Sequence, residues 1–125
     1  MAANCLWVAL GGALGAVGRY LCGMLPFLQR GSFPLATLLI NLAGAFLIGL
    51  IAQIAAQRGM QNSGAVLFWK VGLCGGFTTF STFSLETVAL LSSGKTLPAA
   101  AYIVSSVLLC LLGVALGQWL GQKLA

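Results

Sequence analysis

The stretch Gly75-Gly76-Phe77-Thr78-Thr79-Phe80-Ser81-Thr82-Phe83-Ser84 lies inside a long apolar segment, residues 63–93, whose midpoint is residue 78. Two adjacent glycines followed by hydroxyl and β-branched residues make a poor continuous helix. One alternative is an unbroken helix whose Ser and Thr hydroxyls bond carbonyls four residues earlier. We favour an interruption, so the sequence predicts a helix that is broken close to its centre.

On both sides of this stretch the chain consists almost entirely of apolar segments. A transmembrane helix needs about 20 apolar residues. Four segments reach that length, approximately 4–25, 34–57, 63–93 and 97–124. The connections are short, and no soluble domain is left over. The sequence therefore predicts an all-α membrane protein, a single transmembrane domain over residues 1–125. It has four transmembrane helices, the third broken at mid-membrane.

The composition excludes several classes of function. Of the 125 residues, 60% are hydrophobic and 6% charged, with six Lys or Arg, one acid and no His. A soluble domain carries about 25% charged residues. There is no imidazole base, carboxylate pair or zinc ligand set, so we expect no enzyme. Single, scattered cations make no nucleic-acid patch. The four cysteines lack CxxC spacing, and we interpret them as apolar packing residues.

The cations that flank the segments are divided almost evenly between the two sides. Arg58 and Lys123 would lie on one side of the membrane, and Arg30 and Lys95 on the other. Orientation normally follows a clear Lys/Arg excess. Either an unassigned partner fixes the topology, or both orientations occur. The second interpretation predicts an antiparallel, dual-topology homodimer with its two-fold axis in the membrane plane.

Small residues recur every three or four positions on three of the four segments. Such stripes let helix backbones approach closely in lipid. Any one stripe is interpreted first as packing within a single four-helix bundle. Because four helices have few buried faces, we also expect some of the stripes to face another subunit. The stripes are Gly11, Gly15 and Gly23, with Arg19 on the same face; Ala45, Gly49, Ala52 and Ala56; and Gly113, Gly117 and Gly121.

An interruption at mid-membrane leaves backbone polar groups without helical partners. Such backbone occurs only where it is buried in protein or lines a cavity, and there it commonly coordinates an ion. In an antiparallel dimer the two interruptions would meet at the two-fold axis. Converging carbonyls would form an oxygen cage for a hard monovalent cation, since no carboxylate is nearby to hold a divalent one.

Several polar and aromatic residues admit both a structural and a functional interpretation. Asn41, on the same helix face as Thr37, either bonds a neighbouring helix or donates N–H groups to an anion. Phe80 and Phe83 would share a face, where they either pack in a core or direct their positive ring edges toward an anion. Arg19 either extends to the headgroups or concentrates anions in a vestibule.

Glu86 is the only acidic residue, about two helical turns from the end of the third segment. It is either neutral or bonded to hydroxyl groups. We favour a structural role for it over a role in transport.

Three stretches of the chain resemble the Fluc (CrcB) family of fluoride channels, and the resemblance covers nearly the full length. They are residues 11–20 (GGALGAVGRY), 37–44 (TLLINLAG) and 72–86 (GLCGGFTTFSTFSLE). The resemblance implies a passive, fluoride-selective channel in the bacterial inner membrane, a multi-pass protein that exports cytoplasmic fluoride. It also implies an antiparallel homodimer with two pores and a central structural sodium ion (Na⁺).

The resemblance further implies a role for individual residues. Backbone carbonyls of Gly75 and Thr78 would hold the sodium ion. The pore would be lined by Asn41, Phe80, Phe83, Ser81, Thr82 and Tyr102, with Tyr102 adjoining the phenylalanines.

Two other functions compete with this interpretation. A dual-topology exporter of cationic small molecules, of the small multidrug resistance type, would need an acid in the first span. That span holds Arg19 and no acid. A non-transporting subunit of a larger complex would explain the glycine stripes, but not a helix break at mid-membrane.

Overall fold

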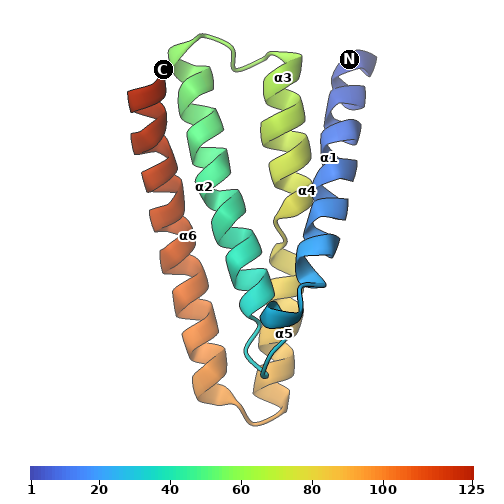
Figure 1. Cartoon of the computed structure of the whole chain (residues 1–125), viewed down its shortest axis with the longest axis vertical. Helices are drawn as coiled ribbons and strands as arrows, with labels where there is room; N and C mark the ends of the chain where they lie inside the picture. Colours follow the sequence, from blue (N-terminus) through green and yellow to red (C-terminus); the bar gives the residue numbers. More distant parts are fainter.

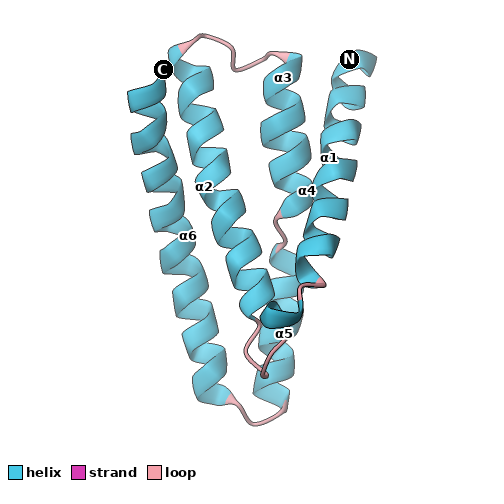
Figure 2. Cartoon of the chain, viewed as in Figure 1, coloured by secondary structure: helices cyan, strands magenta, loops and turns pink.

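The computed structural model describes residues 1–125 and contains helices and connections but no strand (Figure 2). Three helices are long and unbroken: α1 (Ala2–Gly23), α2 (Leu35–Gln57) and α6 (Thr96–Leu124). By length and composition these three could each cross a membrane. A short 3-10 helix, η1 (Pro26–Leu28), lies in the connection between α1 and α2.

The third apolar segment is divided into several elements. It comprises α3 (Gly64–Val66), the π-helical η2 (Leu67–Cys74), α4 (Gly75–Phe77) and α5 (Phe80–Ser92). Between α4 and α5 the backbone is extended, with φ −83° and ψ 157° at Thr78 and φ −151° and ψ 115° at Thr79. The chain therefore leaves helical geometry for two residues inside the glycine- and threonine-rich stretch.

The helices form two closely packed pairs (Figure 1). One pair is α1 with the α3–η2–α4 part of the third segment, and the other is α2 with α6. α5 continues beyond the interruption and contacts α6. Both chain termini lie at the same end of the molecule.

Glycines bring α1 and the third segment into backbone contact. A Cβ atom added to Gly11 would strike the Phe68 carbonyl and lie 2.9 Å from the Leu73 nitrogen. One added to Gly76 would lie 2.5 Å from the Gly12 carbonyl oxygen. Any larger residue at these positions would therefore separate the two elements.

The second pair uses glycine in the same way. A Cβ atom on Gly49 would strike the Val114 carbonyl, and one on Gly117 would strike the Phe46 carbonyl. Gly113 and Gly121 also face α2. For these glycines, and for Gly11 and Gly15, the structure shows packing within one chain, which is the first of the two interpretations of the stripes. Their close contacts are within the chain, because two helix pairs already provide a partner for each stripe.

Two of the turns at the helix ends have the same geometry. After α2, Gly59 has φ +64° and the Met60 N–H donates to the Ala55 carbonyl at 2.9 Å. After α5, Gly94 has φ +76° and the Lys95 N–H donates to the Leu90 carbonyl at 2.9 Å. Glycine suits both positions because a left-handed residue lets the chain bond back to the last carbonyls of the helix.

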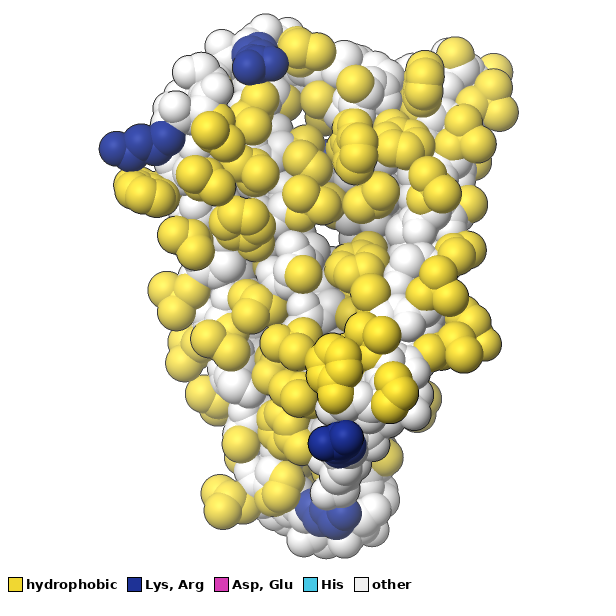
Figure 3. Space-filling view, viewed as in Figure 1, with side chains coloured by type: hydrophobic (Ala, Val, Ile, Leu, Met, Phe, Trp, Pro, Cys, Tyr) yellow, Lys and Arg dark blue, Asp and Glu magenta, His cyan; other side chains and the backbone are white.

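The surface of the chain is mostly apolar. Only 21 of 125 residues are buried, and large hydrophobic side chains are exposed along every long helix. In Figure 3 hydrophobic side chains cover the middle of the visible face, and Lys and Arg lie toward its two ends. Such a surface suits lipid in the middle and headgroups at the ends. The chain is a multi-pass membrane protein.

Candidate functional site

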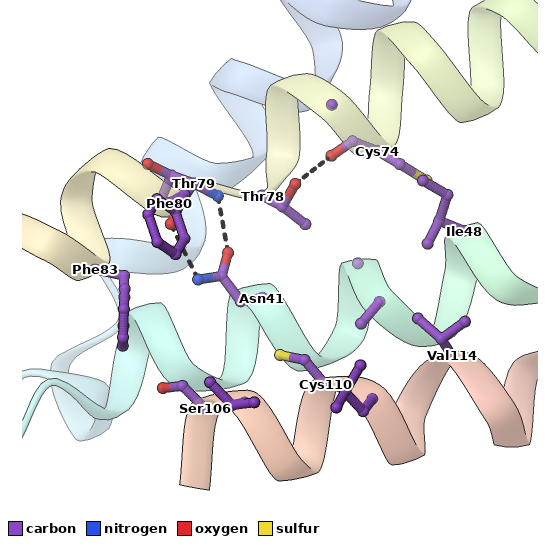
Figure 4. Close-up of a pocket in the computed structure, with 15 residues that line it drawn as sticks. Asn41, Ile48, Cys74, Thr78, Thr79, Phe80, Phe83, Ser106, Cys110 and Val114 are labelled. Atoms are coloured by element: carbon purple, nitrogen blue, oxygen red, sulfur yellow. Dashed lines mark hydrogen bonds between the residues drawn. The ribbon is translucent and has the colours of Figure 1, made fainter. Parts of the chain in front are cut away.

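A groove of about 410 Å³ runs along the interrupted segment, with α2 and α6 on its other side. The helix interruption therefore forms part of the groove wall (Figure 4). The groove brings together five of the residues expected from the sequence: Asn41, Gly75, Thr78, Phe80 and Phe83.

The Asn41 side chain bonds the backbone of the interruption in both directions. Its Nδ2 donates to the Thr79 carbonyl oxygen at 3.1 Å, and the Thr79 N–H donates to Asn41 Oδ1 at 2.8 Å (Figure 4). The amide thus links α2 to the extended residues, in agreement with the interpretation that Asn41 bonds a neighbouring helix. An amide nitrogen carries two N–H groups, so one remains available to the groove.

Arg19 also contacts the interrupted segment. Its Nε donates to the Gly76 carbonyl oxygen at 3.2 Å, across the contact between α1 and α4. The side chain is half-buried and bonded to protein, rather than extended freely toward headgroups. A cation next to the last carbonyls of a helical segment is also favoured by the helix dipole.

Threonine and serine hydroxyls surround the two extended residues. Thr79 Oγ1 accepts from the Thr82 N–H at 3.2 Å and thereby caps the first turn of α5. It also donates to Thr82 Oγ1 at 3.1 Å and lies 3.3 Å from Ser81 Oγ. Thr78 Oγ1 donates to the Cys74 carbonyl oxygen at 2.9 Å. Ser81 and Thr82 therefore belong to one hydroxyl cluster centred on Thr79.

Four aromatic rings form a continuous row from the groove to the core. Ring centroids are 5.4 Å apart for Phe80 and Phe83, 5.0 Å for Phe83 and Tyr102, and 5.6 Å for Tyr102 and Phe33. Phe80 is 79% exposed and Tyr102 is fully buried. The row thus begins at an uncovered ring and ends in a cluster around Leu38, where α2, α5 and α6 meet.

Glu86 lies at the buried end of this row, apart from the helix interruption. Its Oε1 accepts from the Tyr102 hydroxyl at 3.1 Å. It also lines a smaller cavity of about 240 Å³ with Ser32, Ser93 and Lys95. Thr37 is buried on α2. The bond to a buried hydroxyl agrees with a structural role for Glu86.

Ser106 is a groove residue that sequence reasoning missed. It is buried, it lines the groove, and its hydroxyl has no hydrogen-bond partner. The signal was available, since Ser106 follows Tyr102 by four residues and therefore shares its face of α6. A buried hydroxyl without a partner is costly, which marks this wall of the groove as a place where a donor is available.

The site could hold a cation only through neutral oxygen ligands. Clusters of three or more His, Cys, Asp or Glu do not occur in the chain. The residue Gly75 is exposed, and nothing lies within 4 Å of the place where its Cβ would be. In a continuous helix the Thr79 N–H would bond the Gly75 carbonyl, but here it bonds Asn41. The Gly75 carbonyl oxygen thus has no helical donor. A free, neutral oxygen of this kind suits a hard monovalent cation.

Comparison with known proteins gives one consistent result. Residues 6–118 match the family described as CrcB-like protein, Camphor Resistance (CrcB). A protein of Ruminiclostridium cellulolyticum named Fluoride-specific ion channel FluC is 46% identical over 123 residues, covering 98% of this chain and 95% of its own. The protein of the same name from Helicobacter acinonychis is 43% identical over 121 residues, 94% of each chain. That of Magnetococcus marinus is 46% identical over 117 residues, covering 93% and 95%.

Proposed function

This chain belongs to the CrcB-like family, and we propose that it is a passive channel selective for fluoride. The observation that carries the proposal is the similarity, over nearly the whole chain, to proteins named as fluoride-specific ion channels. Relatives of this kind are ion channels and not enzymes. The groove beside the helix interruption is the place where we expect the ion to interact with the chain.

We propose that two copies assemble in antiparallel orientation. The groove is open on one side, and Phe80, a large aromatic residue, is 79% exposed in it. In a dimer with a two-fold axis in the membrane plane, the same surface of each copy would cover the Phe80 ring of the other copy. The even division of Arg58, Lys123, Arg30 and Lys95 between the two ends supports insertion in both orientations.

The proposed central ion is sodium, held by backbone carbonyls of Gly75 and Thr78 from each copy. Both residues line the groove, and Gly75 has open space beside it. The ion would supply a fixed positive charge where two sets of carbonyl oxygens meet. No charged side chain is needed for this, since hard cations accept neutral oxygen ligands.

The proposed fluoride path follows the phenylalanines and the hydroxyl cluster, one pore for each copy. Fluoride is small and strongly hydrated, so a pore must replace its water with directed donors. Phe80 and Phe83 offer positive ring edges, and Asn41 offers the amide N–H that Thr79 does not use. The hydroxyls of Ser81 and Thr82 lie at the start of α5, and Tyr102 contacts Phe83. A narrow path of this type excludes larger halides.

A proton-coupled exporter of cations is less well supported. Such an exporter would need an acid in the first span, and the only acid here is Glu86 on α5, where it accepts a hydrogen bond from Tyr102. α1 carries Arg19, which is bonded to Gly76. We therefore expect fluoride to move passively, and in the cell outward, down its own gradient.

Ion efflux from liposomes that contain the purified protein tests this function. With potassium salts inside and valinomycin to carry the counter-charge, fluoride should leave rapidly and chloride should stay. The rate should not change when the proton gradient is abolished. Equal efflux of both halides, or dependence on a proton gradient, would contradict the proposal.

Topology can be tested separately by biasing the loops. Two lysines added to the turn at residues 60–62 should force one orientation and abolish activity. Two lysines added near residues 30–32 should force the other, and co-expression of the two variants should restore fluoride efflux. Full activity of either variant alone would exclude the antiparallel arrangement.

A further inference from the structure

Two successive carbonyls at the end of α4 lose their helical partners in different ways. In an α-helix the Thr79 N–H would bond the Gly75 carbonyl, and the Phe80 N–H would bond the Gly76 carbonyl. The preceding bond of the ladder is still present, since the Thr78 N–H donates to the Cys74 carbonyl at 3.0 Å. The interruption therefore begins at the bond that would have occupied the Gly75 oxygen.

Side chains of two other helices take the place of the missing bonds. Arg19 donates to the Gly76 carbonyl at 3.2 Å, so that oxygen is occupied. Asn41 accepts the Thr79 N–H at 2.8 Å and donates to the Thr79 carbonyl at 3.1 Å. No side chain, and no N–H from a turn or from the interruption, donates to the Gly75 carbonyl. Gly75 lines the groove, and nothing lies within 4 Å of the place where its Cβ would be. One carbonyl is thus left free between two that are bonded.

We infer that Asn41 is a positioning residue: by holding the Thr79 amide, it keeps the helix open and leaves the Gly75 carbonyl free to bind the central cation. This inference rests on the proposed sodium site but not on contact between Asn41 and fluoride. Its physical basis is competition for one donor. If the Asn41 oxygen is removed, the Thr79 N–H must find another acceptor in an apolar region, and Gly75 is its helical one.

The chain offers a direct spectroscopic readout of this carbonyl. Only two Gly-Gly pairs occur in the sequence, Gly11-Gly12 and Gly75-Gly76. With glycine labelled by ¹³C at the carbonyl and by ¹⁵N, a carbonyl–nitrogen correlation spectrum of the full protein in lipid bilayers should contain two peaks. The Gly75 peak reports the carbonyl in question, and the Gly11 peak is an internal reference in α1.

In the wild-type protein the Gly75 peak should differ between samples purified in sodium and in N-methylglucamine salts, and the Gly11 peak should not. In Asn41→Leu the Gly75 peak should move downfield, toward a hydrogen-bonded helical carbonyl, and should be the same in both salts. Leu39→Ala, an exposed position on the same helix, is the control and should leave both peaks unchanged. A Gly75 peak that stays in place and still responds to sodium in Asn41→Leu would overturn the inference.

A second variant tests the inference if Asn41→Leu does not fold, which loss of the Gly11 peak would reveal. Asn41→Asp retains an oxygen that accepts the Thr79 N–H but lacks the Nδ2 donor. Its Gly75 peak should therefore resemble that of the wild type, including the response to sodium, while fluoride efflux decreases. Movement of this peak to the helical position would again overturn the inference.

The same spectra separate this inference from the proposed function on which it rests. A wild-type Gly75 peak that does not respond to sodium would refute the sodium site. Displacement of the peak in Asn41→Leu would then still establish that Asn41 controls this carbonyl. Conversely, a sodium response that Asn41→Leu leaves intact would refute the role of Asn41 and support the sodium site.

Discussion

The two helix pairs of this molecule satisfy their backbones by different means. In the α2–α6 pair both helices are continuous, so almost every N–H and carbonyl is bonded within its own helix. In the pair formed by α1 and the third segment, the backbone is interrupted at Thr78 and Thr79, and side chains replace the lost bonds. Both pairs are joined by glycine contacts. Close packing is therefore common to the two pairs, and polar side chains bond the backbone from outside in only one of them.

The largest effect is expected where the two pairs are alike, at the glycine contacts. Gly117→Ala should destabilise the fold by about 3 kcal/mol, because its Cβ would strike the Phe46 carbonyl and lie 2.8 Å from the Leu50 nitrogen. Unfolding in mixed micelles measures this loss. Gly12→Ala is the matched control, since its Cβ would meet only the Gly72 carbonyl at 3.9 Å. Equal stability of the two variants would contradict the close-contact explanation.

The second-largest loss of stability is expected only in the pair formed by α1 and the third segment. Arg19→Met removes the charged donor to the Gly76 carbonyl and should cost about 1.5–3 kcal/mol, the range for a hydrogen bond to a charged group. The rate of fluoride efflux should also decrease in this variant. Arg19→Lys keeps the charge but has no N–H at the Nε position, so an intermediate loss is expected. If Arg19→Met were as stable and active as the wild type, Arg19 would not be needed at the interruption.

A smaller effect is expected at the first turn of α5. Thr79→Val keeps the shape and the backbone but removes the oxygen that accepts the Thr82 N–H. Loss of such a cap should cost about 1 kcal/mol. Amide hydrogen exchange at Thr82 should accelerate by a corresponding factor of roughly five to ten. Thr79→Ser retains the cap and should behave as the wild type; equal exchange in both variants would speak against capping.

The smallest effect should be found in the continuous pair. The Ser105 hydroxyl donates to the Ala101 and Tyr102 carbonyls of its own helix, which retain their helical partners without it. Ser105→Ala should therefore change the free energy of unfolding by no more than about 0.5 kcal/mol. A loss as large as that of Thr79→Val would mean that hydroxyls matter equally in both pairs, and the contrast between them would disappear.

The sequence was sufficient to locate the apolar segments, because each is a long run bounded by glycine, proline or charge. The predicted segment 34–57 lies within one residue of α2, and 97–124 within one residue of α6. The first segment was placed two residues too late, since η1 begins at Pro26 and α1 ends at Gly23. Periodicity could not reveal the π-helical turns of η2, because a pattern of apolar residues does not report which carbonyl each N–H bonds.

The hydrogen-bond partners and packing neighbours of the site residues cannot be predicted from one sequence. Spacing placed Asn41 and Thr37 on one face of a helix, but not Thr79 opposite Asn41. Both sequence-based interpretations of Arg19 place its charge next to water, whereas in the structure its Nε donates to the Gly76 carbonyl. The spacing of the glycine stripes indicates contact surfaces, but it does not say which of them pack within the chain, as Gly11, Gly49 and Gly117 do. Each of these depends on how helices are placed in space, which local patterns do not determine.

The order of the segments along the chain matters for how the protein is made. The side chains that complete the interrupted backbone come from α1 and α2, both of which leave the ribosome before residues 78 and 79. When the third segment enters the bilayer, Arg19 and Asn41 can already be in place. Unbonded peptide groups would otherwise be exposed to lipid. If a gene were circularly permuted so that the third segment was synthesised first, its insertion should stall at the translocon until the later helices arrived.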